Sequence, residues 1–288
     1  MTLDQALSDE LTTIKIPPRP AILLNIQREM RAPEPDFPAI EKIISLDVGI
    51  SASLVKIANS PLFGTQRHVR SIREALHLLG LNAVASAVAA LALRQSFARV
   101  PNLERFWDSS ARIAQLSGWL AAQLPPRERG IRQEEVFTFG LFRDCGIPVL
   151  MSMYSDYYEI LKIANEEAER PFTAVETEEL DLDHTMIGGL LAQEWELPDE
   201  FHAAISAHHD LEQLRDDCET PLPEVSRYLI AIAQLAEFIF QSLTGLNRTC
   251  EWPKLGATCR AILGIDEDQV HALVAQANQS RVHTQPMI

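Results

Sequence analysis

Apolar residues recur at helical spacing along nearly the whole chain, and this pattern limits the fold more than any other feature. Hydrophobic side chains three and four positions apart mark one face of a helix. Three such sets are Ile22, Leu23 and Ile26; Ile40, Ile43 and Ile44; and Leu54, Val55 and Ala58. No stretch alternates between apolar and polar residues for long enough to demand a strand. The short β-like run 136–142 follows Glu134 and Glu135 and is interpreted as a buried helix. The pattern therefore predicts an all-α protein.

Helix-start signals agree with this periodicity. Ser71 is followed three residues later by Glu74, and Thr173 by Glu176, and each pair predicts a capping box at the start of a helix. Residues 81–97 are rich in alanine and apolar on every side. A helix that is apolar all round is surrounded by other helices, so this segment is predicted to form the core of the first half.

The step at residues 99–102, which contains Pro101, predicts a joint between two helical bundles, since proline is favoured at a helix start. We therefore expect an N-terminal helical half over residues 1–100 and a second helical half over residues 101–245. Residues 246–288 are predicted to form a C-terminal helical extension and tail. The N-terminal bundle is expected to pack against the C-terminal one.

Charge and cysteine content restrict the surroundings of the protein. The formal net charge is -15, from 40 acidic and 25 basic residues, which repels nucleic acid and anionic lipid. The four cysteines form no C-x-x-C pair, which favours a reducing compartment. Residues 1–15 show no signal-peptide pattern, and the longest apolar runs, 83–93 and 228–240, are shorter than the ~20 residues of a membrane span. The sequence thus predicts a cytoplasmic protein without nucleic-acid or membrane partners.

Nine short motifs occur in one order along the chain. They are IPPRP at 16–20, IISLD at 43–47, ANSPLFG at 58–64, SIREALHLLGL at 71–81, FWDSS at 106–110, GLFRDCG at 140–146, DHTMIGG at 183–189, WELP at 195–198, and the pair His208 and His209. This series is similar to the HDOD family, the HD-related output domain of bacterial signalling proteins. The resemblance covers roughly residues 14–240. It implies that the second half is an HD-like helical bundle.

The resemblance also implies which residues would hold a metal. HD phosphohydrolases bind a divalent ion through a histidine, an adjacent His-Asp pair and a later aspartate. The matching positions here are Ser109, then Arg143 and Asp144, then Gln234. Only Asp144 is a usual ligand for such an ion, and it lies beside a permanent guanidinium charge. We therefore expect a degenerate site with no catalytic residue, no metal and no cofactor.

Three histidines match other positions of the superfamily. His184, His208 and His209 correspond to residues that supply a second metal in cyclic-dinucleotide phosphodiesterases. The Gly-Tyr-Pro motif that follows in those enzymes is missing, because the chain continues Asp210-Leu211. In one interpretation His184 and His208 form hydrogen bonds within the bundle while His209 is partly solvated. In the other, weak residual binding of a divalent metal or a ligand persists.

Together these positions define a candidate ligand or partner cleft formed by Arg143, Asp144, His184, His208 and His209. We interpret the chain as a catalytically inactive signalling module that acts through a protein partner, with gating by a ligand left open. The alternatives are a metal-dependent phosphohydrolase acting on a nucleotide, and a nucleotide or cyclic-dinucleotide sensor in which Arg143 grips phosphate. The sequence specifies neither the partner, nor the pathway, nor the oligomeric state.

Arg143 is also predicted to stand in for the missing metal as the cation of the site. Neighbouring residues on a helix do not share a face, so Arg143 can meet Asp144 only where a helix ends. Otherwise another acid in the cleft is required.

Overall fold

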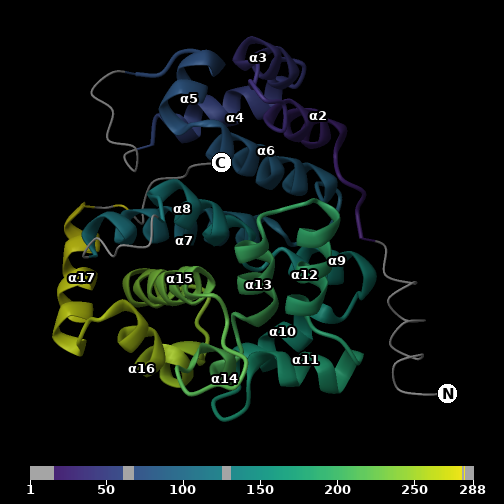
Figure 1. The fold of residues 1–288 in the computed structure, drawn as a ribbon. Helices are drawn as coiled ribbons and strands as arrows, with labels where there is room; N and C mark the ends of the chain where they lie inside the picture. Colours follow the sequence, from purple (N-terminus) through teal and green to yellow (C-terminus); the bar gives the residue numbers. More distant parts are fainter. Residues whose placement is uncertain (1–15, 61–67, 125–130, 281, 283–288) are drawn as a thin grey trace.

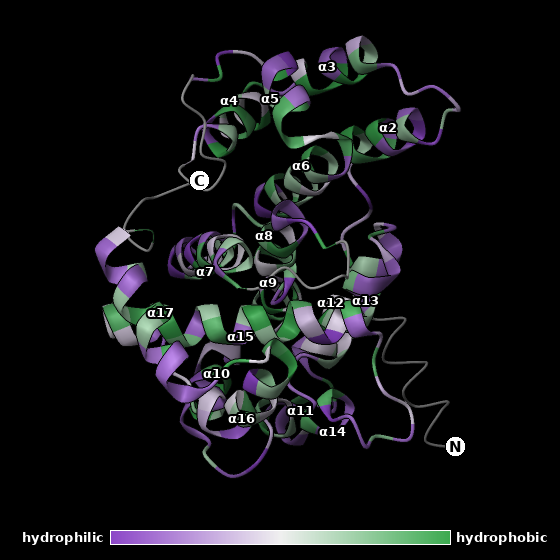
Figure 2. Ribbon diagram, turned by 60° about the vertical axis from the view of Figure 1, so that its left-hand side comes forward, coloured by the Kyte–Doolittle hydropathy of each residue, from purple (hydrophilic) through white to green (hydrophobic). Residues whose placement is uncertain are grey.

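Helices dominate the computed structural model, which describes residues 16–60, 68–124, 131–280 and 282 (Figure 1). No strand occurs within these described ranges, so the all-α prediction is confirmed. Residues 1–15 and the second half of the ANSPLFG motif lie outside them. Figure 2 shows hydrophobic residues gathered along helices such as α15, which other helices surround.

The first half is a group of five described helices. These are α2 (Ala21–Met30), α3 (Phe37–Ser45), α4 (Val48–Ala58), α5 (Ile72–Leu79) and α6 (Leu81–Ser96). Figure 1 shows them above α7 and α8, with α6 lying between the other four helices and α8. Helix α6 contacts α2, α4 and α5 on one side and α8 on the other. Its side chains from Ala83 to Leu93 are almost all buried, as predicted for residues 81–97.

The second half surrounds one long buried helix, α15. Its helices are α7 (Glu104–Gln123), α8 (Gln133–Phe142), α9 (Gly146–Met153), α10 (Tyr157–Glu166), α11 (Phe172–Leu180), α12 (His184–Glu194), α13 (Asp199–Ala207), α14 (Leu211–Leu214), α15 (Glu224–Thr244), α16 (Glu251–Leu263) and α17 (Glu267–Ser280). Helix α15 contacts α7, α8, α13, α16 and α17. The predicted domain joints fall in the α6–α7 connection and directly after α15, and remain predictions.

The run 136–142 lies in α8, so its interpretation as a buried helix is confirmed. The stretch Gln133–Met153, which spans α8 and α9, is long and apolar enough to cross a membrane by length and composition. Its apolar window is 72% buried inside the protein, however. Such burial is typical of a core helix, because the apolar side chains are already covered by neighbouring helices.

Of the two predicted capping boxes, one forms in part and the other is wrong. Ser71 caps α5 as expected, since its hydroxyl accepts from the backbone N–H of Glu74 at 3.1 Å, but Glu74 Oε2 accepts from the backbone N–H of Arg70 at 2.6 Å and not from that of Ser71. Helix α11, in contrast, begins at Phe172 directly after Pro171, so Thr173 lies inside the helix. Glu176 is fully buried and turns toward Tyr157 and His184 instead of capping the helix. Donors in the core therefore outcompete the helix end for this carboxylate.

The two halves are held together by polar contacts at the turn after α12. The indole N–H of Trp195 donates to the carbonyl of Pro17 at 2.8 Å. The amide of Gln27 on α2 donates to the carbonyl of Trp195 at 2.9 Å, and Arg19 pairs with Glu196 at 2.6 Å. Since α12 begins at His184, the N-terminal segment helps to seat a helix of the candidate cleft.

Candidate functional site

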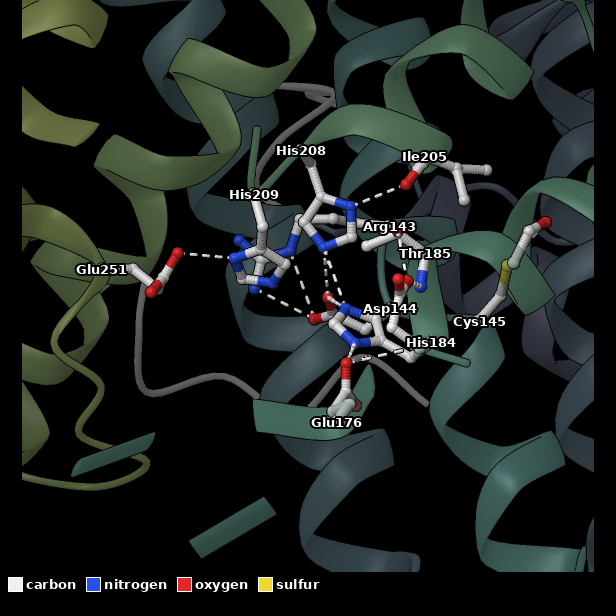
Figure 3. Close-up of polar contacts among 12 residues, drawn as sticks. Arg143, Asp144, Cys145, Glu176, His184, Thr185, Ile205, His208, His209 and Glu251 are labelled. Carbon is white, nitrogen blue, oxygen red and sulfur yellow. Dashed lines mark hydrogen bonds and ion pairs between the residues drawn. The ribbon is translucent and has the colours of Figure 1, made fainter. Parts of the chain in front are cut away.

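Four of the five predicted cleft residues form one compact cluster. Each of Asp144, His184, His208 and His209 offers one potential ligand atom, and these atoms all lie within 4.8 Å of one another. They come from the α8–α9 turn, the start of α12 and the end of α13 (Figure 3). The fold thus gathers residues that lie up to 65 positions apart.

The close approach of α9 and α12 depends on glycine. A Cβ atom at Gly146 would lie 2.0 Å from the carbonyl oxygen of His184 and 2.8 Å from the backbone nitrogen of Gly188. No side chain fits at those distances. Asp183 fixes the start of α12 by accepting from the backbone N–H groups of Thr185 and Met186. These two local features bring His184 to the turn that carries Asp144.

Arg143 lies at the base of the cluster with only 4% of its side chain exposed. Its Nε and Nη2 atoms donate to Asp144 Oδ2 at 3.2 and 3.0 Å, and Nη1 donates to Glu237 Oε2 at 3.0 Å. Helix α8 ends at this residue, which lets the adjacent side chains meet. Both conditions set by the sequence, a helix end and another acid, are therefore present.

This ion network sets the charge of the site. Burial alone would raise the pKa of Asp144, but the Arg143 guanidinium, together with His208 and His184, outweighs burial and holds that pKa well below its usual range. Burial raises the pKa of Glu237, and Arg143 opposes the shift. With two carboxylates bound, the guanidinium is already neutralised. This arrangement gives no support to Arg143 as a phosphate grip.

The side chains at the two remaining degenerate positions, Ser109 and Gln234, also form hydrogen bonds within the chain. The Ser109 hydroxyl donates to the carbonyl of Arg105 at 2.8 Å and contacts the amide of Asn247. The Gln234 amide donates to the carbonyl of His208 at 3.4 Å. Neither side chain provides an anionic ligand. The donor set expected for the first metal of an HD enzyme therefore does not fit an ion here.

Each histidine of the cluster is held by an outer acceptor at its Nδ1 atom. His184 Nδ1 lies 2.7 Å from Glu176 Oε2, and His209 Nδ1 lies 2.5 Å from Glu251 Oε2. His208 Nδ1 lies 2.8 Å from the carbonyl oxygen of Ile205. Carboxylates and carbonyls only accept, so each Nδ1 carries a hydrogen.

The opposite ring nitrogens of two histidines face the Asp144 carboxylate. His208 Nε2 lies 3.1 Å from Asp144 Oδ1, and His184 Nε2 lies 3.2 Å from His208 Nε2 and 3.9 Å from the same oxygen. Neutral rings protonated at Nδ1 present lone pairs at Nε2. Where the Nε2 atoms of His184 and His208 meet the Asp144 carboxylate, hydrogen-bond acceptors therefore outnumber donors. An outer acceptor on Nδ1 is also the usual arrangement around a metal-binding histidine. The four residues thus fit one divalent ion that prefers imidazole, such as zinc, rather than magnesium.

The prediction that His209 is partly solvated is wrong. Its side chain is 8% exposed, and its ring stacks on Phe172 with centroids 4.8 Å apart. The covering residue, Glu251, begins α16 and lies 42 positions further along the chain. The predicted hydrogen bonding of His184 and His208 within the bundle is confirmed.

In the absence of a metal ion, protonation of His184 supplies the hydrogen-bond donor that the cluster otherwise lacks. Burial lowers the pKa of this imidazole, but the carboxylates of Glu176, Asp144 and Asp183 together outweigh burial and raise the pKa to about 9, with Glu176 contributing most. Burial and the neighbouring His209 lower the pKa of His208 to about 3. One imidazolium and one neutral imidazole can then share a hydrogen bond between their Nε2 atoms.

This arrangement predicts a pH-dependent role for His184 in stability. A pKa raised in the folded state stabilises the protein fully below the unfolded pKa near 6.5, and this stabilisation is lost as pH rises through about 9. In chelator-treated protein, the loss of unfolding free energy caused by His184→Gln should be larger at pH 6 than at pH 10, by about 2 kcal/mol. Urea titrations of both proteins at the two pH values measure it. An equal loss at both values would show that His184 is not protonated in the fold.

A cavity of about 1020 Å³ opens from the cluster. Arg143, Asp144, His184 and His209 lie at its base, and side chains of α7, α9 and α10 form its walls. The connection between α15 and α16 closes another side. The cleft predicted from the sequence is therefore present, although His208 lies behind it, fully buried.

The HDOD domain model matches residues 16–211, which is most of the chain. The chain belongs to the HDOD family. A Geobacter sulfurreducens HDOD domain protein of unknown function has a similar fold, with a TM-score of 0.68 and 21% identity over 98% of this chain and 95% of that one. A Shewanella amazonensis protein described as a candidate phosphohydrolase gives a TM-score of 0.66 and 20% identity over 95% of both chains.

Two further proteins are also similar to this chain. A Marinobacter aquaeolei protein described as a candidate signal transduction protein gives a TM-score of 0.64 and 20% identity, over 95% of this HDOD chain and 61% of that one. An uncharacterized Treponema pallidum protein is 27% identical over 235 residues, which are 80% of this chain and 43% of that protein. The chain thus spans less than half the length of that relative.

Proposed function

We propose that this HDOD chain is a regulatory module of bacterial signalling that acts in the cytoplasm through contact with a protein partner, without hydrolysing a substrate. One observation carries the proposal. The guanidinium of Arg143 takes the place of a metal-binding histidine and pairs with Asp144 and Glu237. The Arg143 guanidinium is thus the cation at the position of the His-Asp pair, and a guanidinium cannot activate water as a metal ion does.

The other degenerate positions support the same proposal. The side chains of Ser109 and Gln234 donate to backbone carbonyls. These two positions therefore supply no ligands for a pair of metal ions that would hold a phosphate. Family membership fits a regulatory role, and the Marinobacter protein carries a signal-transduction description. The active nucleotide phosphohydrolase and the Arg143-based nucleotide sensor are both less well supported by the geometry.

Partner capture tests the regulatory part of the proposal. Tagged wild-type protein and Asp144→Asn should recover the same protein from cells that express the chain naturally, because contact, rather than turnover, makes the complex. The isosteric asparagine removes the charge of the surviving ligand but retains its shape. Recovery of no protein by the wild type above an untagged control would contradict the proposal. Recovery that is lost in Asp144→Asn while the variant stays folded would place the partner contact at the cluster.

A second candidate function is the binding of one metal ion without turnover. The convergence of His184 and His208 on Asp144, with His209 in the same group, favours it. Asp144 and the three histidines would hold the ion, which would tie the α8–α9 turn to α12 and α13. Such an ion supplies Lewis acidity when bound.

Zinc titration tests the metal site directly. His208→Gln should weaken zinc binding at least about tenfold, because it removes one of four ligands. His202→Gln is the matched control, since His202 lies on the same helix outside the cluster. Calorimetry on chelator-treated protein measures both affinities. Equal affinities in the two variants would rule out the cluster as the zinc site.

A further inference from the structure

We infer that residues 247–251, which connect α15 to α16, form a strap that closes the cavity and holds His209 in position. All five residues line the cavity, and the strap lies beyond the segment that the family model matches. Its closed state rests on contacts with α7, with the α10–α11 region and with His209. The inference is independent of whether the site binds a metal or a partner.

The first anchor of the strap is Asn247. Helix α15 ends at Gly245 with a φ of 69°, and Asn247 also has a positive φ of 49°. Its side chain reaches α7, where the Arg105 Nη2 atom donates to Asn247 Oδ1 at 3.2 Å and the Asn247 amide contacts Ser109. Because Ser109 replaces a metal-binding histidine, the strap occupies space next to that degenerate position.

The second anchor joins the strap to the end of α10 and the loop that follows. The backbone N–H of Cys250 donates to the carbonyl of Asn165 at 3.1 Å, and the thiol of Cys250 lies 3.7 Å from the carbonyl oxygen of Glu166. One turn into α16, the ammonium group of Lys254 donates to the carbonyls of Glu167 and Arg170 at 3.1 and 2.9 Å.

The third anchor lies at the base of the cavity. Glu251 is 2% exposed, with Oε2 lying 2.5 Å from His209 Nδ1 and Oε1 lying 2.5 Å from Lys254 Nζ. Burial would raise the pKa of Glu251, but His209 and Lys254 lower it to about 2, so the carboxylate is ionised at neutral pH. Glu251 thus holds the Nδ1 hydrogen of His209 and is a positioning residue for that ring.

The body of α16 is held by apolar packing that does not depend on the strap. Leu255, Cys259 and Leu263 of α16 are buried, and Trp252 stacks on Phe238 of α15 with centroids 4.7 Å apart. The strap itself is held by the polar contacts described above. Breaking those contacts would therefore open the cavity at residues 247–251, while α15 and the rest of α16 stay in place.

Thiol labelling of Cys250 measures this opening without a metal, a partner or turnover. Cys145 and Cys259 are buried, while Cys218 and Cys250 are partly exposed. In a Cys218→Ser background, Cys250 is then the accessible thiol, and its reaction with a disulfide reagent reports on the strap. Because the Cys250 thiol is only partly exposed and contacts the carbonyl of Glu166, we expect slower labelling in the folded protein than in denaturant.

Loosening the anchors should accelerate labelling by about tenfold or more, because each removes charge-assisted or buried hydrogen bonds. The variants are Glu251→Gln, Lys254→Met and Asn247→Gly, and glycine avoids strain at the positive φ of Asn247. Arg215→Ala, which removes an exposed ion pair with Asp217, is the control and should label at the parent rate. Melting curves identify any variant that fails to fold, and the labelling rates of the folded variants then test the strap.

A second readout follows His209 itself. In protein with ¹⁵N-labelled histidine, Glu251→Gln should shift the ring nitrogen resonances of His209, while those of His208, which donates to Ile205, stay in place. Faster labelling together with this shift supports the strap. Labelling of the folded parent as fast as in denaturant, or unchanged rates in every folded anchor variant, would overturn it.

Discussion

Replacement of Arg143 by alanine is expected to lower the free energy of unfolding by about 4 kcal/mol, and the melting temperature by about 10 °C. The guanidinium is 4% exposed and pairs with Asp144 and Glu237 at 3.0 Å. Its removal leaves two carboxylates close together in a poorly solvated place, where unpaired charge is costly. Urea unfolding and a thermal melt at pH 7 measure the loss.

Two controls separate this effect from a general loss of arginine. Arg73→Ala removes an arginine that is 65% exposed and pairs with Glu41 at the surface, so it should cost less than about 1 kcal/mol. The triple variant Arg143→Met, Asp144→Asn, Glu237→Gln removes all three charges together and should recover much of the stability lost in Arg143→Ala. An Arg143→Ala variant as stable as the wild type would contradict the role of Arg143 as the stabilising cation of the site.

Replacement of Gly146 by alanine is expected to cost more than about 3 kcal/mol. The added Cβ would lie 2.0 Å from the carbonyl oxygen of His184, which is backbone and cannot rotate away. Helices α9 and α12 would have to separate, which would also move Asp144 away from His184. Denaturant unfolding reports the stability, and zinc titration reports the geometry of the cluster.

Gly49→Ala is the matched control for this substitution. Gly49 lies in the first turn of α4, and its added Cβ would lie 3.3 Å from Asp47 Oδ1, a side-chain oxygen that caps the helix and needs to shift by only a few tenths of an ångström. Alanine is favoured over glycine inside helices, so this variant should be neutral or slightly stabilising. A Gly146→Ala variant with the stability of Gly49→Ala would show that α9 and α12 are not in close contact.

The sequence was sufficient to predict the helices, the buried run 136–142 and the core role of residues 81–97, because local apolar spacing determines these features. The resemblance to the HDOD family selected Asp144, His184, His208 and His209, because the motifs that carry them are local in the sequence. The partners of these residues were not predictable in the same way. The sequence pattern predicts Glu176 to be a capping residue, and its interaction with His184 arises only when α11 packs beside α12.

Glu251 and Glu237 illustrate two different limits of sequence reasoning. Glu251 lies outside the family match, and nothing local links it to His209, so the burial of His209 could not be foreseen. Glu237 could have been found, because it lies three residues after Gln234 on α15 and therefore shares a helix face with that degenerate position. The acid required by Arg143 was thus present in the sequence pattern.

Phosphohydrolase assays on protein of known metal content test the absence of turnover most directly. Wild-type protein and Asp144→Asn would be loaded with zinc, manganese, iron, nickel or magnesium, and bound metal would be quantified in each sample. Nucleotides, cyclic dinucleotides and an aryl phosphate would serve as substrates. A non-catalytic module gives background rates in both proteins, even when wild type holds one ion per chain. Metal-dependent hydrolysis by wild type that disappears in Asp144→Asn would show instead that this HDOD chain is an enzyme.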